Sequence, residues 1–210
     1  IELANTLGIH HEIIPIQSIF ETYLNTLKPY FKDLPANVTE ENIQARIRGM
    51  LLMSFSNKFK YILLNTTNKS EMAVGYGTLY GDLCGGIAVL ADVYKTEVYE
   101  LANYINRQSV RIPINTILKP PSAELKAGQK DSDSLPDYSI LDKVLYQYIE
   151  QHKGPNEIIN QGADKNLVLK ILKMVNSAEF KRFQSPPVLR VSYKSFGSGR
   201  RLPIEGNYLY

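Results

Sequence analysis

Polar side chains that could bind a nucleotide follow a short apolar run near the middle of the chain. The run covers residues 61–64, and Thr66 and Asn68 come soon after it. Asn68 and Glu71 have the spacing of a capping box at the start of a helix, which Gly75 would end early. A strand end, a helix N-terminus and a glycine-rich loop are typical of an anion or nucleotide site in an α/β sheet. The stretch therefore predicts such a site.

The same pattern also has a purely structural interpretation. Glycine-rich turns usually connect elements and bind nothing, and Asn-x-x-Glu at a helix start usually only caps the helix. Glu71 is thus either a capping residue or a functional carboxylate. Tyr76 and Tyr80 either stack on a ligand ring or pack in the core. The residues alone leave these alternatives open.

The elements around this stretch alternate between strands and helices. Apolar spacing of three and four residues predicts helices, and short apolar runs predict strands. We expect helices over residues 3–7, 17–30, 39–58, 95–106, 139–149, 157–160, 166–175 and 178–183, and strands over residues 11–16, 61–64 and 87–90. This alternation predicts an α/β fold with a parallel, Rossmann-like sheet and flanking helices. We expect a long loop over residues 112–137 and a mobile basic tail from Ser192.

The predicted helix over residues 39–58 has two distinct faces. Thr39 suits its N-cap, and the apolar positions between residues 43 and 55 form one stripe. Asn42 and Arg46 are four residues apart and share another face. That face is either a solvated polar surface or part of a binding site.

Length and composition limit the class of protein. The chain has 210 residues, of which 44% are hydrophobic and 21% are charged, so it can form one globular domain with a sizeable core. A net charge of +3 is too small to predict a nucleic-acid partner. No apolar run approaches the length of a membrane span, and the single cysteine, Cys84, suits a reducing compartment. We expect a cytoplasmic protein without nucleic-acid or membrane partners, and no metal site at its three histidines.

Residues 68–82 read N-K-S-E-M-A-V-G-Y-G-T-L-Y-G-D, and this segment resembles the signature of bacterial NAD synthetases. Four more segments agree in order, namely residues 41–48, 92–96, 119–125 and 179–187. Together they cover nearly the whole chain, and residues 129–138 are most similar to the glutamine-dependent type. The resemblance implies an N-type ATP pyrophosphatase fold, which is Rossmann-like. It divides the chain into an α/β core (1–111), an active-site loop (112–137) and a helical region with a tail (138–210).

The family amidates deamido-NAD to NAD with ATP and Mg²⁺, through an adenylated intermediate, and takes nitrogen from ammonia or glutamine. The resemblance implies that Glu71 and Lys95 are catalytic and that Glu71 holds Mg²⁺ beside phosphates. It implies ATP contacts from Thr66, Lys95 and Ser122. The positions that match deamido-NAD contacts are Asn42, Arg46, Glu71, Tyr76, Gly77, Thr78, Leu79, Asp82 and Lys181.

One motif of the family does not occur in this sequence. The phosphate loop Ser-Gly-Gly-x-Asp-Ser precedes the region that matches Ile1, and the chain does not begin with Met. We therefore expect the C-terminal part of a synthetase domain, inactive alone, that forms a homodimer or larger oligomer through the helix over residues 39–58. One alternative is a non-catalytic, dinucleotide-binding or dimer-forming fragment. The other is a GMP synthetase-like relative, against which the Asn-Lys-Ser-Glu segment argues.

Overall fold

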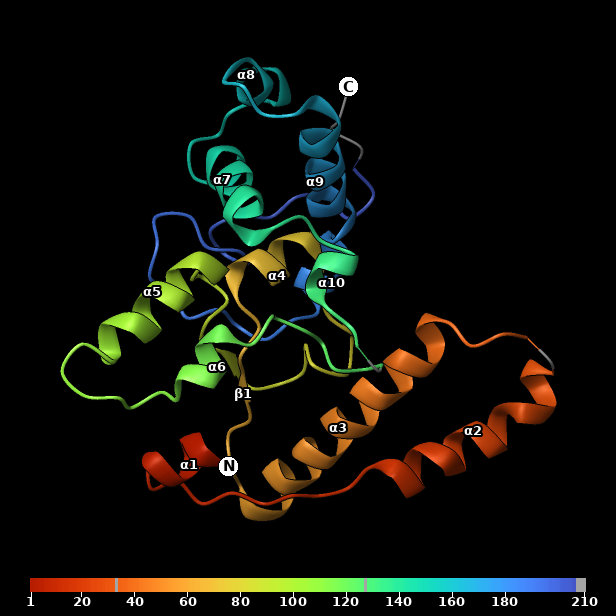
Figure 1. Ribbon diagram of the computed structural model, residues 1–210. Helices are drawn as coiled ribbons and strands as arrows, with labels where there is room; N and C mark the ends of the chain where they lie inside the picture. The colour runs from red at the N-terminus through yellow and green to blue at the C-terminus, as the bar shows by residue number, and fades with distance from the viewer. Residues whose placement is uncertain (33, 127, 207–210) are drawn as a thin grey trace.

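Helices make up most of the fold, and two very short strands join them (Figure 1). The computed structural model describes residues 1–32, 34–126 and 128–206. The helices are α1 (Glu2–Thr6), α2 (Gln17–Phe31), α3 (Val38–Phe59), α4 (Lys69–Val74), α5 (Lys95–Ile105), α6 (Ile114–Leu118), the 3₁₀ turn η1 (Asp131–Asp133), α7 (Tyr138–Ile149), α8 (Pro155–Asn160), α9 (Lys165–Ser177) and α10 (Glu179–Phe183). Each predicted helix is confirmed, with small differences at the ends. Among the described helices, none is both long enough and apolar enough to cross a bilayer.

The sheet is short and parallel. Strand β1 (Leu64–Asn65) pairs with β2 (Ile87–Ala88), with Leu64 opposite Ile87 and Asn65 opposite Ala88. Val188 adds an isolated parallel bridge to Ala88. The α/β class and the parallel pairing are confirmed, although the strands are shorter than predicted. Parallel strands need a crossover between them, and here the crossover contains α4 and the glycine-rich loop.

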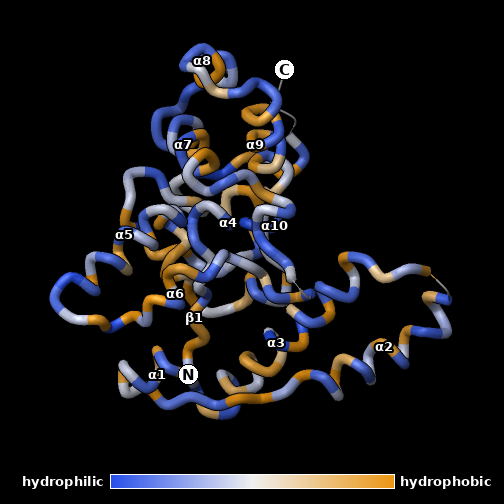
Figure 2. Tube along the Cα trace, viewed as in Figure 1, coloured by the Kyte–Doolittle hydropathy of each residue, from blue (hydrophilic) through white to orange (hydrophobic). Residues whose placement is uncertain are grey.

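Helix α4 lies at the centre of the molecule, where it packs against α5, α7 and α9 (Figure 1). Its Met72 and Ala73 are buried in one apolar cluster with Leu141 and Leu145 of α7 and Ile171 of α9. Figure 2 shows that α7 and α9 turn apolar residues toward each other and toward α4. Burial of such side chains is the main stabilising contribution to folding. The helix that begins at the predicted site is therefore anchored in the core.

Helices α2 and α3 pack as an antiparallel pair that extends away from the core (Figure 1). Asn37 caps α3, because its side chain accepts a hydrogen bond from the backbone N–H of Thr39. The prediction that Thr39 is the N-cap is therefore wrong by two residues. Ile43 and Ile47 are buried, whereas Met50 is 62% exposed, so the chain covers only the first part of the apolar stripe.

The strand predicted over residues 11–16 is wrong, and the one predicted over residues 61–64 overlaps β1 only at Leu64. Residues 11–16 are irregular and mostly exposed, and β1 begins only at Leu64, with Tyr61 and Ile62 exposed before it. A strand needs a neighbour for its backbone N–H and C=O groups. Residues 11–16 have no strand partner among the described residues, and of residues 61–64 only Leu64 belongs to a pairing strand. The predicted long loop contains α6 and η1. The predicted mobile tail instead packs on the core, because Ser195 and Phe196 are buried.

Candidate functional site

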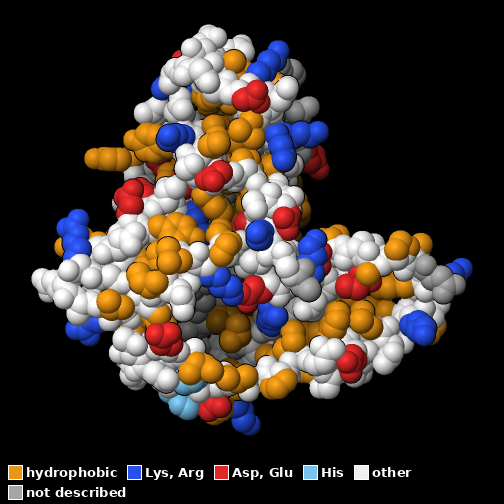
Figure 3. Space-filling view, in the orientation of Figure 1, with side chains coloured by type: hydrophobic (Ala, Val, Ile, Leu, Met, Phe, Trp, Pro, Cys, Tyr) orange, Lys and Arg blue, Asp and Glu red, His pale blue; other side chains and the backbone are white. Residues whose placement is uncertain are grey.

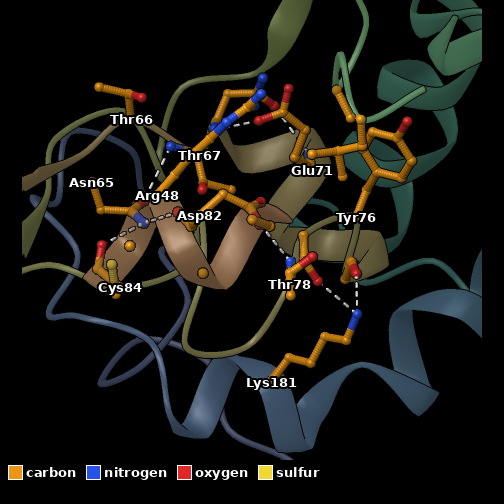
Figure 4. Close-up of a pocket in the computed structure, with 18 of the residues that line it drawn as sticks. Arg48, Asn65, Thr66, Thr67, Glu71, Tyr76, Thr78, Asp82, Cys84 and Lys181 are labelled. Carbon is orange, nitrogen blue, oxygen red and sulfur yellow. Dashed lines mark hydrogen bonds between the residues drawn. The ribbon is translucent and has the colours of Figure 1, made fainter. Parts of the chain in front are cut away.

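A cavity of about 710 Å³ opens between α3, α4 and the glycine-rich loop. Residues from five separate segments line it, and Figure 4 shows how several of them converge. The predicted site residues in its wall are Asn42, Thr66, Glu71, Tyr76, Gly77, Thr78, Asp82, Lys95, Ser122 and Lys181. The polypeptide thus brings together side chains that lie up to 139 positions apart in the sequence, from Asn42 to Lys181.

Glu71 uses its two carboxylate oxygens for two different contacts. Its Oε2 accepts the backbone N–H of Asn68 at 3.0 Å, while Asn68 Oδ1 accepts the N–H of Glu71 at 3.0 Å, so the capping box is complete. Its Oε1 lies 3.5 Å from the Lys95 ammonium. Burial raises the pKa of Glu71, and the charge of Lys95 opposes that rise. The capping role is therefore confirmed, and it leaves one oxygen of Glu71 facing the cavity.

Lys181, on α10, holds the glycine-rich loop in place. Its ammonium donates to the carbonyl oxygens of Gly75 at 2.7 Å and Gly77 at 2.8 Å (Figure 4). Burial lowers the pKa of Lys181, and the nearby Asp82 carboxylate opposes that change. An ammonium group has three donors, so one donor of Lys181 is left for a ligand in the cavity.

Asn42 and Asp82 fix the position of Thr78 on the cavity wall. The Thr78 hydroxyl donates to Asn42 Oδ1 at 2.8 Å, and the Thr78 backbone N–H donates to Asp82 Oδ1 at 2.8 Å. These bonds connect the loop to α3. A Cβ atom at Gly81 would lie 2.9 Å from the carbonyl carbon of Ala45 on α3, so only glycine permits this close approach.

Asp131 is a buried carboxylate in the cavity wall that the sequence did not single out as a site residue. It accepts hydrogen bonds from the hydroxyls of Tyr76 at 3.0 Å and Tyr138 at 2.8 Å. Tyr76 is therefore an anchor for the predicted loop over residues 112–137 as well as a wall residue. Asp131 lies inside the segment 129–138 that supported the resemblance, which was the available signal.

The loop that carries Ser122 is tied to α3. Gln44 donates to the Leu125 carbonyl at 2.8 Å, and Gln129 donates to Glu41 at 3.2 Å. Asn65 is a second wall residue missed by the site prediction. Its buried amide donates to the carbonyl oxygens of Asp82 and Cys84, and this holds the far end of the glycine-rich loop against β1.

Arg46 and Leu79 do not line this cavity. Arg46 lines a second cavity between α2 and α3 and donates to the Leu79 carbonyl at 3.2 Å. Leu79 itself packs against the apolar cluster. Tyr80 is 67% exposed, and its hydroxyl donates to Gln184. A role of Arg46 or Leu79 in deamido-NAD binding stays a prediction.

Magnesium fits the donor set of the cavity only as an ion shared with phosphates. In the described part of the chain, no cluster of three or more His, Cys, Asp or Glu could hold a metal. Mg²⁺ typically takes one or two protein carboxylates together with phosphate oxygens and water. The cavity-facing oxygen of Glu71 suits such a site. The exposed His10 pairs with Glu12 at 3.0 Å.

A family model described as NAD synthase matches residues 1–185. The chain belongs to this family. It is 53% identical over 202 residues to a glutamine-dependent NAD(+) synthetase of Synechocystis sp., and the match covers 96% of the chain but 36% of that protein. The chain thus spans about a third of the length of the curated relatives that it matches.

Two solved structures agree with this membership. A glutamine-dependent NAD+ synthetase from Acinetobacter baumannii in complex with ADP is 45% identical, with a TM-score of 0.56, over 97% of this chain and 36% of that one. A glutamine-dependent NAD(+) synthetase from Cytophaga hutchinsonii, 24% identical over 96% of this chain and 35% of that one, shares the fold with a TM-score of 0.78. The fold is the N-type ATP pyrophosphatase fold expected from the sequence.

Proposed function

We propose that the protein carrying this chain converts deamido-NAD to NAD, with ATP as the activating substrate and Mg²⁺ as the metal. One observation carries the proposal: the predicted ATP, deamido-NAD and Mg²⁺ contacts gather in one cavity, apart from Arg46 and Leu79. Membership of the NAD synthase family and the names of the relatives support it. The ADP bound to the Acinetobacter baumannii relative supports an adenine nucleotide as a ligand.

The chemistry proceeds by activation of a carboxylate. An oxygen of the nicotinate carboxylate attacks the α-phosphorus of ATP, and the bond from that phosphorus to the pyrophosphate oxygen breaks. The nitrogen of ammonia then attacks the acyl carbon, AMP leaves with the bonding electron pair, and the nitrogen loses a proton. Each NAD therefore yields one AMP and one pyrophosphate. Catalysis of such steps depends on positioning and on fixed charges around the phosphates.

The lysines and Glu71 of this chain supply those charges. Lys95 is partly exposed to the cavity, where its ammonium can approach phosphate oxygens as a point charge. Bound Mg²⁺ would neutralise phosphate charge, and Glu71 would hold it through the oxygen that is not used in the cap. Asn42, Thr78 and Lys181 form the opposite wall and would orient the dinucleotide.

We also propose that this chain is the C-terminal part of the synthetase domain. It would comprise an α/β core (1–111), an active-site loop (112–137) and a helical region with a tail (138–210). The relatives are named glutamine-dependent, which supports ammonia released from glutamine as the nitrogen source. A chain with the single cysteine Cys84 suits the reducing cytoplasm.

We further propose a homodimer that uses α3. A second cavity, of about 970 Å³, lies between α2 and α3, and Figure 3 shows apolar side chains gathered along these helices. Met50 and Phe59 are more than half exposed. Two-fold dimers are the commonest assembly of soluble proteins. Light scattering of the complete protein at micromolar concentration should give a dimer or a multiple of it; a monomer would contradict this proposal.

The test of the function is a stoichiometric assay of the complete protein. Deamido-NAD, ATP and Mg²⁺ are supplied with ammonia or glutamine, and NAD, AMP and pyrophosphate are measured together. We expect all three products in equal amounts. Lys181→Met should raise the KM for deamido-NAD by about tenfold, the equivalent of one lost charged hydrogen bond. The matched control is Lys173→Met, at an exposed position on α9. Binding of deamido-NAD without turnover would favour the non-catalytic alternative.

A further inference from the structure

Two buried polar residues beside the cavity have no role in the proposed site. Ser70 of α4 is completely buried, and Asp142 of α7 is 6% exposed. The Ser70 hydroxyl donates to Asp142 Oδ1 at 2.5 Å. Buried polar groups are costly unless they are hydrogen-bonded, so this pair needs an explanation. The three helices α4, α5 and α7 pack on one another at this point (Figure 1).

The pair caps the N-terminus of α5 from outside that helix. The first N–H groups of a helix have no partner within it, and Tyr94, at the N-cap position, supplies no side-chain acceptor. Instead, the N–H of Lys95 donates to Ser70 Oγ at 2.9 Å, and the N–H of Thr96 donates to Asp142 Oδ2 at 2.9 Å. The Thr96 hydroxyl donates to the same oxygen at 2.9 Å.

A negative charge is needed at this helix end. Lys95 is the first residue of α5, where the positive end of the helix dipole disfavours a cation. The Asp142 carboxylate lies at the same end and offsets both the dipole and the ammonium charge. Burial raises the pKa of Asp142, and the hydrogen bonds from Ser70 and Thr96 oppose that rise. Both Asp142 oxygens accept hydrogen bonds, Oδ1 from Ser70 and Oδ2 from Thr96.

Adjacent residues of α4 hold Lys95 at its two ends. Ser70 accepts the backbone N–H of Lys95, and Glu71 pairs with its ammonium at 3.5 Å. The contact with Ser70 fixes the backbone of Lys95, and the contact with Glu71 fixes its ammonium group at the cavity. We propose that Ser70 and Asp142 are positioning residues that place Lys95 against Glu71 for phosphate binding, an inference that rests on the proposed function.

A purely structural pair would behave differently from a positioning pair. Loss of a structural cap lowers stability and leaves the kinetics of each folded molecule unchanged. Loss of a positioning group that acts only through Lys95 lowers kcat/KM for ATP, and this loss disappears once Lys95 itself is removed. Mutations of groups that act through one another are not additive, whereas independent ones are.

The experiment is a double-mutant cycle in the complete protein, with Ser70→Ala and Lys95→Met alone and combined. We expect Ser70→Ala to lower kcat/KM for ATP about tenfold and Lys95→Met about a hundredfold, in line with misplaced or missing charge at a phosphate site. The combined variant should match Lys95→Met within about twofold. Asp142→Asn, which keeps the side-chain shape, should behave like Ser70→Ala.

The control is Asp164→Ala, which removes the N-cap hydrogen bond that Asp164 accepts from Leu167 on α9, a helix without a predicted site residue. It should lower the melting temperature and leave kcat/KM unchanged. Wild-type kcat/KM in Ser70→Ala, or losses that multiply with Lys95→Met, would overturn the positioning role alone. A wild-type rate in Lys95→Met would overturn the phosphate-binding role of Lys95 and the positioning role with it. No NAD from the unmodified protein would instead overturn the proposed function.

Discussion

Replacement of Lys69 by methionine tests how a buried ion cluster holds the C-terminal segment of the chain. The Lys69 ammonium is fully buried and lies 2.8 Å from Asp92 Oδ1, and it also contacts the carboxylate of Glu150. It donates to Ser192 Oγ at 2.9 Å and to the Lys194 carbonyl at 2.8 Å. One ammonium thus connects the first residue of α4 to α7 and to the segment after residue 190.

The expected loss of unfolding free energy follows from the two carboxylates that lose their cation. Methionine has a similar volume but leaves the Asp92 and Glu150 carboxylates without this cation. Removal of one partner from a buried ion pair costs about 3–5 kcal/mol of unfolding free energy. For a domain of 150–250 residues, each kcal/mol shifts the melting temperature by about 2–4 °C. We therefore expect Lys69→Met to melt roughly 6–20 °C below the unmodified protein at pH 7.

The loss of stability in Lys69→Met should depend on pH in a definite direction. Burial opposes ionisation of Asp92, but the hydrogen bonds from Lys69, Ser192 and Val191 outweigh it and lower the Asp92 pKa. A carboxyl with a lowered folded-state pKa adds stability above its ordinary value of 3.8, and this stability is lost as the pH falls through the folded-state pKa. Lys69→Met removes the first of these hydrogen bonds. The Asp92 part of the stability difference between the two proteins should therefore be present in full above pH 3.8 and shrink as the pH falls below that value.

The assay is thermal unfolding of the complete protein at several pH values, with hydrogen exchange to locate the change. Val191 and Ser192 donate their N–H groups to Asp92, so their amides should exchange faster in the variant. Lys143→Met, at an exposed position on α7, is the matched control and should change little. Equal melting temperatures for Lys69→Met and the control would refute the reasoning that this cluster stabilises the fold.

Three further predictions concern the cavity. Glu71→Gln keeps an oxygen for the cap but loses the charge beside Lys95. Steady-state activity should fall about a hundredfold, or about 2.7 kcal/mol, with little change in melting temperature. Wild-type rates across a Mg²⁺ titration would contradict the catalytic role of Glu71. Burial raises the pKa of Glu71 above its ordinary 4.5, so protons compete with Mg²⁺ for the carboxylate. The half-saturating Mg²⁺ concentration should therefore fall as the pH rises above 4.5. This pH dependence should vanish in Glu71→Gln. Gly81→Ala would force the loop away from α3 and should impair deamido-NAD binding measured by calorimetry, whereas Gly154→Ala, which meets only ordinary contacts, should not.

The helices could be predicted from the sequence because their signals are local. Asn68 and Glu71 lie within one helical turn of each other, so the capping box of α4 was visible in the spacing, and the structure confirms both of its hydrogen bonds. Gly75 ends the helix in the left-handed region, at a φ of 68°, which glycine adopts at little cost. The same reasoning missed the cap of α3, because Asn37 and Thr39 are both good capping residues two positions apart.

The strands could not be predicted with equal success, because a strand is defined by its partner. The apolar run over residues 61–64 suggested a buried strand, yet only Leu64 pairs, and it pairs with Ile87 from beyond the glycine-rich loop. The run over residues 11–16 has no strand partner among the described residues. Hydropathy shows which residues avoid water, but it does not show which backbone groups will meet.

The residue types of the site were fixed by the sequence, since the segments that resemble the family carry Asn42, Thr66, Glu71, Lys95 and Lys181. Only the tertiary structure decided how these side chains are held and which way they face. It buries Lys69, the neighbour of Asn68, in an ion cluster, and it places Arg46 in the wall of the second cavity. It also joins Ser70 to Asp142, 72 positions later in the chain. Spacing along a helix gives the face of each residue, whereas burial and hydrogen-bond partners depend on the helices that pack against that face.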